Sequence, residues 1–374
     1  MAISDPDVFQ VKGGPIDTTG VRSILLIQLG DIGDVVVTFP CVRALKENFP
    51  AAAVHVAVHE KAAGLIAGCR WADGVIVARQ TRGLAGTIRH GFDLFSRLKH
   101  LRFDLVFDLR TGDRGAIMTL LTGARQRVSF WGRHNTWWRN RIFTHLVQAR
   151  RHNSPFIVDY YLGLPGVFGI RPQSSVPVFD VSAEHENAAR DVLAVHGIAD
   201  GDAVVAVQPF SLWAYKEWPA DRMGAFMDWL RQRYLVRVIV TGAPDQKARA
   251  DGMVAGREPS VVNLAGRTSL PLLAALLKRC SMAIGVDSAG CHLAAAVGTP
   301  TATIFGPGNF TEWAPRGAHH RVVHHDMPCI PCRDKGCNGS ERSRCLETLE
   351  VDRVIDHVRP QLDDLLEVKW PSNE

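Results

Sequence analysis

The sequence predicts an α/β protein with two domains, each built on a doubly wound parallel sheet. The length of 374 residues exceeds what one hydrophobic core usually supports, so two domains are expected. Short apolar segments alternate with amphipathic helical segments through both halves. Each half opens with an apolar segment that leads into a loop and a helix. Because ligands bind beyond the carboxyl ends of such strands, two Rossmann-like domains facing an inter-domain cleft are predicted.

The first domain is predicted over residues 21–180 and begins with the buried strand Ser23–Leu29. The loop Gly30–Asp34 follows, and then a helix with an apolar face. Further strands of this sheet are expected at Val54–Val58, Val75–Val77, Leu105–Leu109 and Val128–Phe130.

The second domain is predicted over residues 201–348, after a partly helical linker at Val181–Gly201. Amphipathic helices separate its strands, which are expected at Val204–Gln208, Val236–Thr241, Val261–Leu264, Met282–Val286 and Thr301–Phe305. Apolar residues recur at helical spacing in the tail Val351–Leu366, which predicts a C-terminal helix.

The composition is that of a soluble globular protein, with 46% apolar and 22% charged residues. No apolar run reaches the roughly 18–20 residues needed to span a bilayer, and residues 1–20 lack the apolar centre of a signal peptide. A cytoplasmic location is therefore predicted. The 8 cysteines suit that compartment as thiols or metal ligands rather than as a disulfide framework.

Positive charge is concentrated in a basic block, residues 79–152, with 15 Lys and Arg against 4 Asp, a net charge of +11. The whole chain carries only +5, so the remainder sums to −6. Such a block is either a solvated face or a surface for a phosphorylated or membrane-bound partner. The second half has no feature for base recognition, so nucleic acid is not a predicted partner.

Two carboxylates, Asp31 and Asp34, follow the first strand among glycines that let a ligand approach the backbone. Either carboxylate is suited to act as a general base.

In the second half, Asp287 ends an apolar strand, and a helix opens at Ser288. Free N–H groups at that helix start favour phosphate, and Asp287 can accept hydrogen bonds from ribose hydroxyls. The structural alternative is a plain strand-to-helix turn capped by Asp287 or Ser288. His292, in the first turn, either contacts ligand or simply packs. Lys216 follows another strand, where it could neutralise a diphosphate.

The order of these motifs resembles glycosyltransferase family 9, the ADP-heptose:lipopolysaccharide heptosyltransferases. The resemblance covers roughly Val21 to Val358. The residues that carry it are Gly33-Asp34, Lys216-x-Trp218-Pro219, Asn263-Leu264-Ala265-Gly266, Asp287-Ser288-x-x-x-His292, Gly298-x-Pro300-Thr301 and Phe305-Gly306-Pro307. It implies the GT-B fold, in which a C-terminal helix, here residues 349–374, commonly crosses back to the first domain.

The resemblance also implies inverting transfer of L-glycero-D-manno-heptose from ADP-heptose to inner-core lipopolysaccharide, with no catalytic metal or other cofactor. Asp34 matches the catalytic base, and Lys216 matches the residue that stabilises the departing diphosphate. The donor-binding residues implied are Ser211, Lys216, Asp287, Ser288, Ala289, Gly290 and His292.

The acceptor is expected to present phosphates and Kdo carboxylates to the first domain. The acceptor-binding residues implied are Gly33, Arg110, Arg114, Arg125 and Arg127. A peripheral contact with the cytoplasmic face of the inner membrane follows from the lipid-linked acceptor. Two alternatives stay open: a related GT-B transferase for another nucleotide sugar, and a non-catalytic nucleotide- or glycan-binding module.

The sequence departs from the family pattern at three positions. Ala289 replaces the first glycine of the usual Asp-Ser/Thr-Gly turn, Gly308 replaces a common threonine, and Gln28 replaces a common basic residue.

Four cysteines lie in a short, turn-rich segment with the spacing Cys329-x2-Cys332-x4-Cys337-x7-Cys345. Four thiolates at this spacing are compatible with a structural Zn site. Free or packed thiols and disulfides are the two alternatives.

Overall fold

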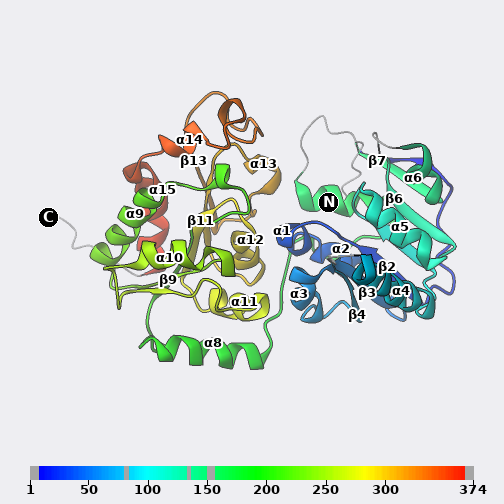
Figure 1. Cartoon of the computed structure of the whole chain (residues 1–374), viewed down its shortest axis with the longest axis horizontal. Coiled ribbons are helices and arrows are strands. Elements are labelled where there is room, and N and C mark those ends of the chain that lie inside the picture. The colour runs from blue at the N-terminus through cyan, green and yellow to red at the C-terminus, as the bar shows by residue number, and fades with distance from the viewer. Residues whose placement is uncertain (1–7, 80–83, 133–135, 150–155, 367–374) are drawn as a thin grey trace. The chain divides into compact units, whose positions relative to one another are not determined.

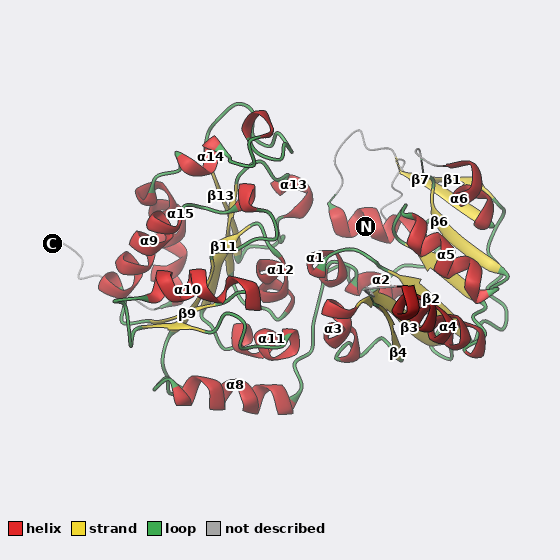
Figure 2. Ribbon diagram, in the orientation of Figure 1, coloured by secondary structure: helices red, strands yellow, loops and turns green. Residues whose placement is uncertain are grey.

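The computed structural model describes residues 8–79, 84–132, 136–149 and 156–366. The chain divides into two compact units, residues 1–180 and 181–374. Each unit is an α/β structure in which helices pack against a central sheet (Figures 1 and 2). No helix in these described segments is long and apolar enough to cross a membrane.

The described part of the first unit contains one sheet with the strand order β1-β7-β6-β5-β2-β3-β4. Its strands are β1 (Val8–Lys12), β2 (Ser23–Ile27), β3 (Ala53–His59), β4 (Gly74–Ala78), β5 (Leu105–Asp108), β6 (Gln126–Phe130) and β7 (His145–Ala149). β1 runs antiparallel to β7 at one edge, and the other pairs are parallel. The central strand β2 has Ile24, Leu25 and Ile27 fully buried, as expected for a parallel strand covered on both faces.

The helices of the first unit follow its strands. They are α1 (Ile32–Val36), α2 (Phe39–Asn48), α3 (Ala63–Ala67), α4 (Leu84–His100), α5 (Asp113–Thr122), α6 (Thr136–Ile142) and α7 (Ile157–Gly166). α2 shows why such a segment forms a helix and docks: Pro40 lies in its first turn, and Val42 and Leu45 are fully buried on its inner face.

The second unit contains an entirely parallel sheet with the order β10-β9-β8-β11-β12-β13. Its strands are β8 (Val204–Gln208), β9 (Arg237–Val240), β10 (Val261–Asn263), β11 (Met282–Val286), β12 (Thr301–Phe305) and β13 (His320–His324). Its helices are α8 (Ala183–Val195), α9 (Ala220–Arg233), α10 (Lys247–Val254), α11 (Leu270–Lys278), α12 (Ala289–Ala296), α13 (Phe310–Trp313), α14 (Arg344–Glu347) and α15 (Val351–Leu365).

The C-terminal helix is described over residues 351–365. The described helix, α15, belongs to the second unit and packs against α9 and β13 (Figure 1). Val354, Val358 and Leu362 form the buried stripe of α15 and join the core of the second unit. Burial of that stripe holds α15 against its own unit. The linker helix α8 likewise packs on α11 of the second unit.

Both sheets reverse the direction of strand addition at one point. In the first sheet, β3 and β4 lie on one side of β2, and β5 starts the other side. In the second sheet, β9 and β10 lie on one side of β8, and β11 starts the other side. In the first sheet, the loops after β2 and β5 therefore lie at its topological switch point. In the second sheet, the loops after β8 and β11 do so. Such points are where α/β sheets bind ligands.

Candidate active site

Three elements of the first unit converge on the side chain of Asp34. Asp34 lies in the first turn of α1, directly after β2, and Arg110 lies in the loop after β5. Arg110 Nη1 donates to Asp34 Oδ1 at 2.9 Å, and the Tyr161 hydroxyl, from α7, donates to the same oxygen at 2.6 Å. A carboxylate at the switch point is thus held on one oxygen by a cation and a phenol.

Local sequence fixes the other oxygen of Asp34. Asp31 is the N-cap of α1, and its main-chain N–H donates to Asp34 Oδ2 at 3.0 Å, as in a capping box. A β-carbon at Gly30 would lie 2.5 Å from Asp34 Oδ2, so glycine is needed there. Asp34 is 7% exposed, whereas Asp31 is exposed. Of the two carboxylates in this loop, Asp34 is the buried one.

The neighbours of Asp34 keep their protons at neutral pH. Burial opposes the charge of Arg110, but the Asp34 carboxylate and Tyr161 outweigh it and raise the pKa of Arg110. Burial and the Asp34 carboxylate raise the pKa of Tyr161 well above its usual value, so its hydroxyl stays a donor. The arrangement suits a general base that is oriented before substrate arrives.

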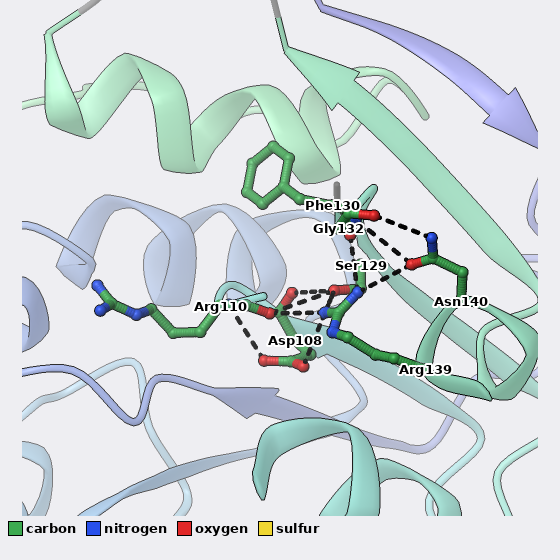
Figure 3. Close-up of polar contacts among 7 residues, drawn as sticks. All are labelled: Asp108, Arg110, Ser129, Phe130, Gly132, Arg139 and Asn140. Carbon is green, nitrogen blue, oxygen red and sulfur yellow. Dashed lines mark hydrogen bonds and ion pairs between the residues drawn. The ribbon is translucent and has the colours of Figure 1, made fainter. Parts of the chain in front are cut away.

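A buried polar cluster lies behind Arg110 (Figure 3). Arg139, from α6, donates from Nη2 to the main-chain oxygen of Arg110 at 2.8 Å and to Ser129 Oγ at 2.7 Å. It also pairs with Asp108, the last residue of β5, at 3.5 Å, and both side chains are fully buried. Burial raises the pKa of Asp108 to about 7, although Arg139 acts in the opposite direction.

The four arginines expected to bind acceptor do not form one surface. Arg110 is engaged with Asp34, and Arg114 is exposed in the first turn of α5, where it donates to the main-chain oxygen of Arg79 at 2.5 Å. Arg125 precedes β6 and Arg127 lies at its amino end; Arg127 donates to the main-chain oxygen of Ile142 at 2.7 Å. The parallel pairing of β2, β5 and β6 places these amino ends at the edge opposite Asp34. Gly33 lies in α1, next to Asp34.

The switch point of the second sheet brings Lys216, Ser211 and Asp287 together. Lys216, in the short turn η3 (Ala214–Lys216) after β8, donates from Nζ to Asp287 Oδ2 at 2.7 Å. Ser211 Oγ donates to the main-chain oxygen of Asp287 at 3.2 Å. Asp287 follows β11 and is 7% exposed, while the Lys216 side chain is 24% exposed. A buried carboxylate and a partly accessible ammonium thus neutralise each other here.

The start of α12 lies directly after Asp287. Ser288 is its N-cap, but its side chain makes no capping hydrogen bond, so the N–H groups of Gly290 and Cys291 lack that acceptor. Such groups, together with the helix dipole, suit an anionic oxygen. His292 is 8% exposed and packs edge-on against Trp313, with ring centroids 6.1 Å apart.

Two glycines make room for polar side chains at this switch point. A β-carbon at Gly290 would collide with the side-chain amide of Gln208, and one at Gly308 would collide with Asp287 Oδ2. The departure from threonine at Gly308 therefore gives space to the Asp287 carboxylate. Gln208, at the end of β8, is 3% exposed, and its side-chain amide has no hydrogen-bond partner among the described residues.

The cysteine segment was compatible with zinc, packed thiols or disulfides, and its cysteines are thiols in the structure. All four thiols are free; Cys345 is buried in the core of the second unit, whereas Cys329 and Cys337 are exposed. Burial, with the other three cysteines nearby, raises the pKa of Cys345 to about 11, so it is a protonated thiol. No group of three or more His, Cys, Asp or Glu side chains in the described segments is arranged to hold a metal ion.

Two α/β units, each with polar side chains at the switch point of its sheet, have the GT-B fold, and solved structures agree with this assignment. The ADP-heptose lipopolysaccharide heptosyltransferase II of Escherichia coli has a TM-score of 0.74 and 19% identity, covering 92% of this chain and 99% of that chain. A family 9 glycosyltransferase of Veillonella parvula has a TM-score of 0.77 and 20% identity, covering 92% and 97%. At these identities the similarity establishes the fold.

The chain belongs to glycosyltransferase family 9 (heptosyltransferase), whose family model matches residues 91–341. A curated relative, lipopolysaccharide heptosyltransferase 3 of Escherichia coli, is 28% identical over 335 residues, which are 88% of this chain and 96% of that protein. The family resemblance drawn from the ordered motifs is confirmed, and the protein is a glycosyltransferase.

Proposed function

We propose that this glycosyltransferase transfers L-glycero-D-manno-heptose from ADP-heptose to an acceptor in the inner core of lipopolysaccharide, with inversion at the anomeric carbon. Its similarity to a lipopolysaccharide heptosyltransferase and to an ADP-heptose enzyme supports this choice of substrates. The observation that carries the proposal is the buried Asp34 carboxylate, held on one oxygen by Arg110 and Tyr161.

In this proposal Asp34 is the general base. Arg110 and Tyr161 occupy Oδ1, and Oδ2 accepts the proton of the acceptor hydroxyl. The acceptor oxygen then forms a bond to the anomeric carbon as the bond from that carbon to the ADP oxygen breaks. Attack on the face opposite the leaving group inverts the configuration, and the proton ends on Asp34.

Lys216 stabilises the departing ADP. In the free protein its ammonium rests on Asp287, and in the donor complex it neutralises the diphosphate, where negative charge grows as the bond breaks. The N–H groups at the start of α12 take up the remaining phosphate oxygens. Ser211, Asp287 and His292 complete the donor site, with Asp287 accepting from sugar hydroxyls. A lysine in this role supplies the charge that a metal ion supplies elsewhere, so transfer is expected to continue in the presence of EDTA.

The acceptor binds to the first unit, near Gly33 and Arg114. Arg114 is exposed at the same sheet edge as Asp34 and can meet a phosphate or carboxylate of the inner core. The basic block also draws the protein to anionic headgroups, because each basic residue near such a surface contributes about 1 kcal/mol. The proposed location is therefore the cytoplasmic face of the inner membrane.

A thermal-shift comparison of nucleotide sugars tests the donor. ADP-heptose is expected to raise the Tm, and UDP- and GDP-sugars at the same concentration are not. Stabilisation by a UDP- or GDP-sugar alone would move the protein to the related transferases for other donors. The anomeric configuration of the product, read by NMR, tests inversion.

Asp34→Asn tests the base. The amide keeps the size of the side chain and loses its basicity, so the transfer rate is expected to fall about 10²–10⁴-fold while stabilisation by ADP-heptose survives. Asp31→Asn, three residues earlier, is the matched control. Loss of transfer in Asp31→Asn with Asp34→Asn nearly fully active would assign the base to Asp31.

A further inference from the structure

Arg139 is the largest fully buried side chain in the described parts of the chain, and the proposed reaction does not use it. A guanidinium removed from water is unfavourable unless it is paired and hydrogen-bonded. Its hydrogen-bond acceptors are Asp108 Oδ2, Ser129 Oγ, Asn140 Oδ1 and the main-chain oxygens of Phe130 and Arg110.

Both members of the Arg139–Asp108 ion pair form a hydrogen bond with the main chain of Arg110. Arg139 Nη2 donates to the Arg110 carbonyl oxygen at 2.8 Å. Asp108 Oδ1 accepts the Arg110 N–H at 3.1 Å. Both polar main-chain groups of this loop residue are therefore bound by the buried pair, and Ser129 Oγ also donates to the carbonyl at 3.5 Å. Figure 3 shows the guanidinium of Arg110 pointing away from this cluster.

The neighbouring helix is shaped around the charged pair. A β-carbon at Gly115, in α5, would lie 2.6 Å from Asp108 Oδ1, so the helix leaves space for the carboxylate. Stability alone does not explain the pair, since well-packed apolar residues of similar volume often replace buried ion pairs without loss of stability. An apolar pair, however, could not form hydrogen bonds with the N–H and the carbonyl of Arg110.

We propose that Arg139 is a positioning residue for the transfer reaction. It fixes the main chain at Arg110, so that the Arg110 guanidinium and Tyr161 together hold Asp34 Oδ1 and set the direction of Oδ2. This inference rests on the proposed role of Asp34 as the base. Arg139 acts through Arg110 and touches no substrate.

The first test is the kinetics of Arg139→Met in the full-length enzyme. The kcat is expected to fall about tenfold to a hundredfold, because misplacing a reacting group by about 1 Å has an effect of that order. The donor KM is expected to stay unchanged. Arg139→Lys, which keeps the charge but not the planar fork, is expected to lie between Arg139→Met and wild type. A wild-type kcat in Arg139→Met would overturn the inference.

The second test asks whether Arg139 acts through Arg110. In an Arg110→Ala background there is no guanidinium left to position, so adding Arg139→Met is expected to lower kcat less than twofold further. A full, multiplicative loss in the double variant would overturn the inference. If Asp34→Asn were fully active, the proposed function would fail instead, so the two failures are distinguishable.

Arg237→Met is the matched control for lost structure. Arg139 donates to two main-chain oxygens, and Arg237 donates to three, those of His196, Gly197 and Pro259. The control is expected to lower the Tm without changing kcat. Should Arg139→Met fail to fold, Ser129→Ala removes one contact of Arg139, one of the Asp108 carbonyl and one, at 3.5 Å, of the Arg110 carbonyl. It is expected to lower kcat in the wild-type background but not in Arg110→Ala, and an equal loss in both backgrounds would overturn the inference.

Discussion

At the scale of single residues, the buried carboxylates at both switch points are already paired in the free protein. Asp34 is paired with Arg110, and Asp287 is paired with Lys216. A buried carboxylate without a partner is strongly unfavourable, so each pairing allows the carboxylate to lie below the protein surface. Each pair also brings a cation to the place where the proposed reaction handles negative charge.

Lys216→Ala tests the donor side of the site. The variant loses the cation and leaves Asp287 unpaired beside the diphosphate. Turnover is expected to fall about 10²–10³-fold, the range seen when one such stabilising donor is removed, and the donor KM is expected to rise. Steady-state kinetics with ADP-heptose measures both.

Lys247→Ala is the control, because Lys247 is an exposed lysine of α10 paired with Asp251. Its kinetics are expected to match wild type. Equal activity in Lys216→Ala and Lys247→Ala would remove Lys216 from the mechanism.

At the scale of elements, the sequence identified the strands that are buried on both faces. Those at Ser23–Leu29 and Val204–Gln208 contain the continuous apolar runs 24–27 and 204–207, as is typical of parallel strands. It missed β1, β7 and β13. β1 and β13 have exposed or half-buried positions at the sheet edges, so their apolar signal is diluted by residues such as Gln10 and Arg321.

The candidate site was predicted only where its residues follow a strand. Asp34, Lys216 and Asp287 sit in loops or first helical turns after apolar runs, a position that points to ligand binding. Tyr161 and Arg139 come from helices that follow other strands, and only folding brings them to Asp34 and Arg110. Arg139 also lay within the basic block, where charge alone predicts a solvated side chain.

Tyr161→Phe tests the contribution of α7. The variant keeps the ring and removes the hydroxyl that donates to Asp34. Loss of one hydrogen bond of about 1–1.5 kcal/mol predicts a roughly tenfold fall in kcat. Tyr160→Phe is the neighbouring control, since its ring stacks on Phe130 with centroids 4.4 Å apart and the stacking survives. A larger loss in Tyr160→Phe than in Tyr161→Phe would contradict this role of Tyr161.

At the scale of the whole molecule, charge separates along the chain, with +11 in the basic block and −6 elsewhere. Arg114→Gln is expected to raise the KM for a phosphorylated acceptor several-fold and to flatten its salt dependence, because one exposed cation near Asp34 is lost. Arg125→Gln, at the opposite sheet edge, is expected to change the KM less. A larger rise in acceptor KM for Arg125→Gln than for Arg114→Gln would contradict the proposed acceptor site and place the acceptor at the opposite end of the strands.

Stability is expected to depend on pH through three histidines that are buried or half-buried. Burial lowers the pKa of His55, His145 and His320 below the usual 6.5. The unfolded chain then binds more protons, so the free energy of unfolding falls as pH drops below about 6.5. Urea unfolding of His55→Phe is expected to show a smaller fall between pH 7 and pH 5 than wild type. Asp108, whose pKa is raised, changes the free energy of unfolding in the opposite direction, but by the same amount in both proteins. An equal fall between pH 7 and pH 5 in His55→Phe and wild type would contradict the prediction.

The Lys216–Asp287 ion pair also bears on the end of the proposed catalytic cycle. When ADP leaves, the Lys216 ammonium pairs with the Asp287 carboxylate again, so release of the product leaves no buried charge without a partner. On donor binding Lys216 exchanges Asp287 for the diphosphate, and on ADP release it exchanges back. The residence time of ADP therefore depends on how strongly Asp287 competes with the diphosphate for Lys216. Lys216 thus binds the phosphates of the donor, and its pairing with Asp287 favours their release after transfer.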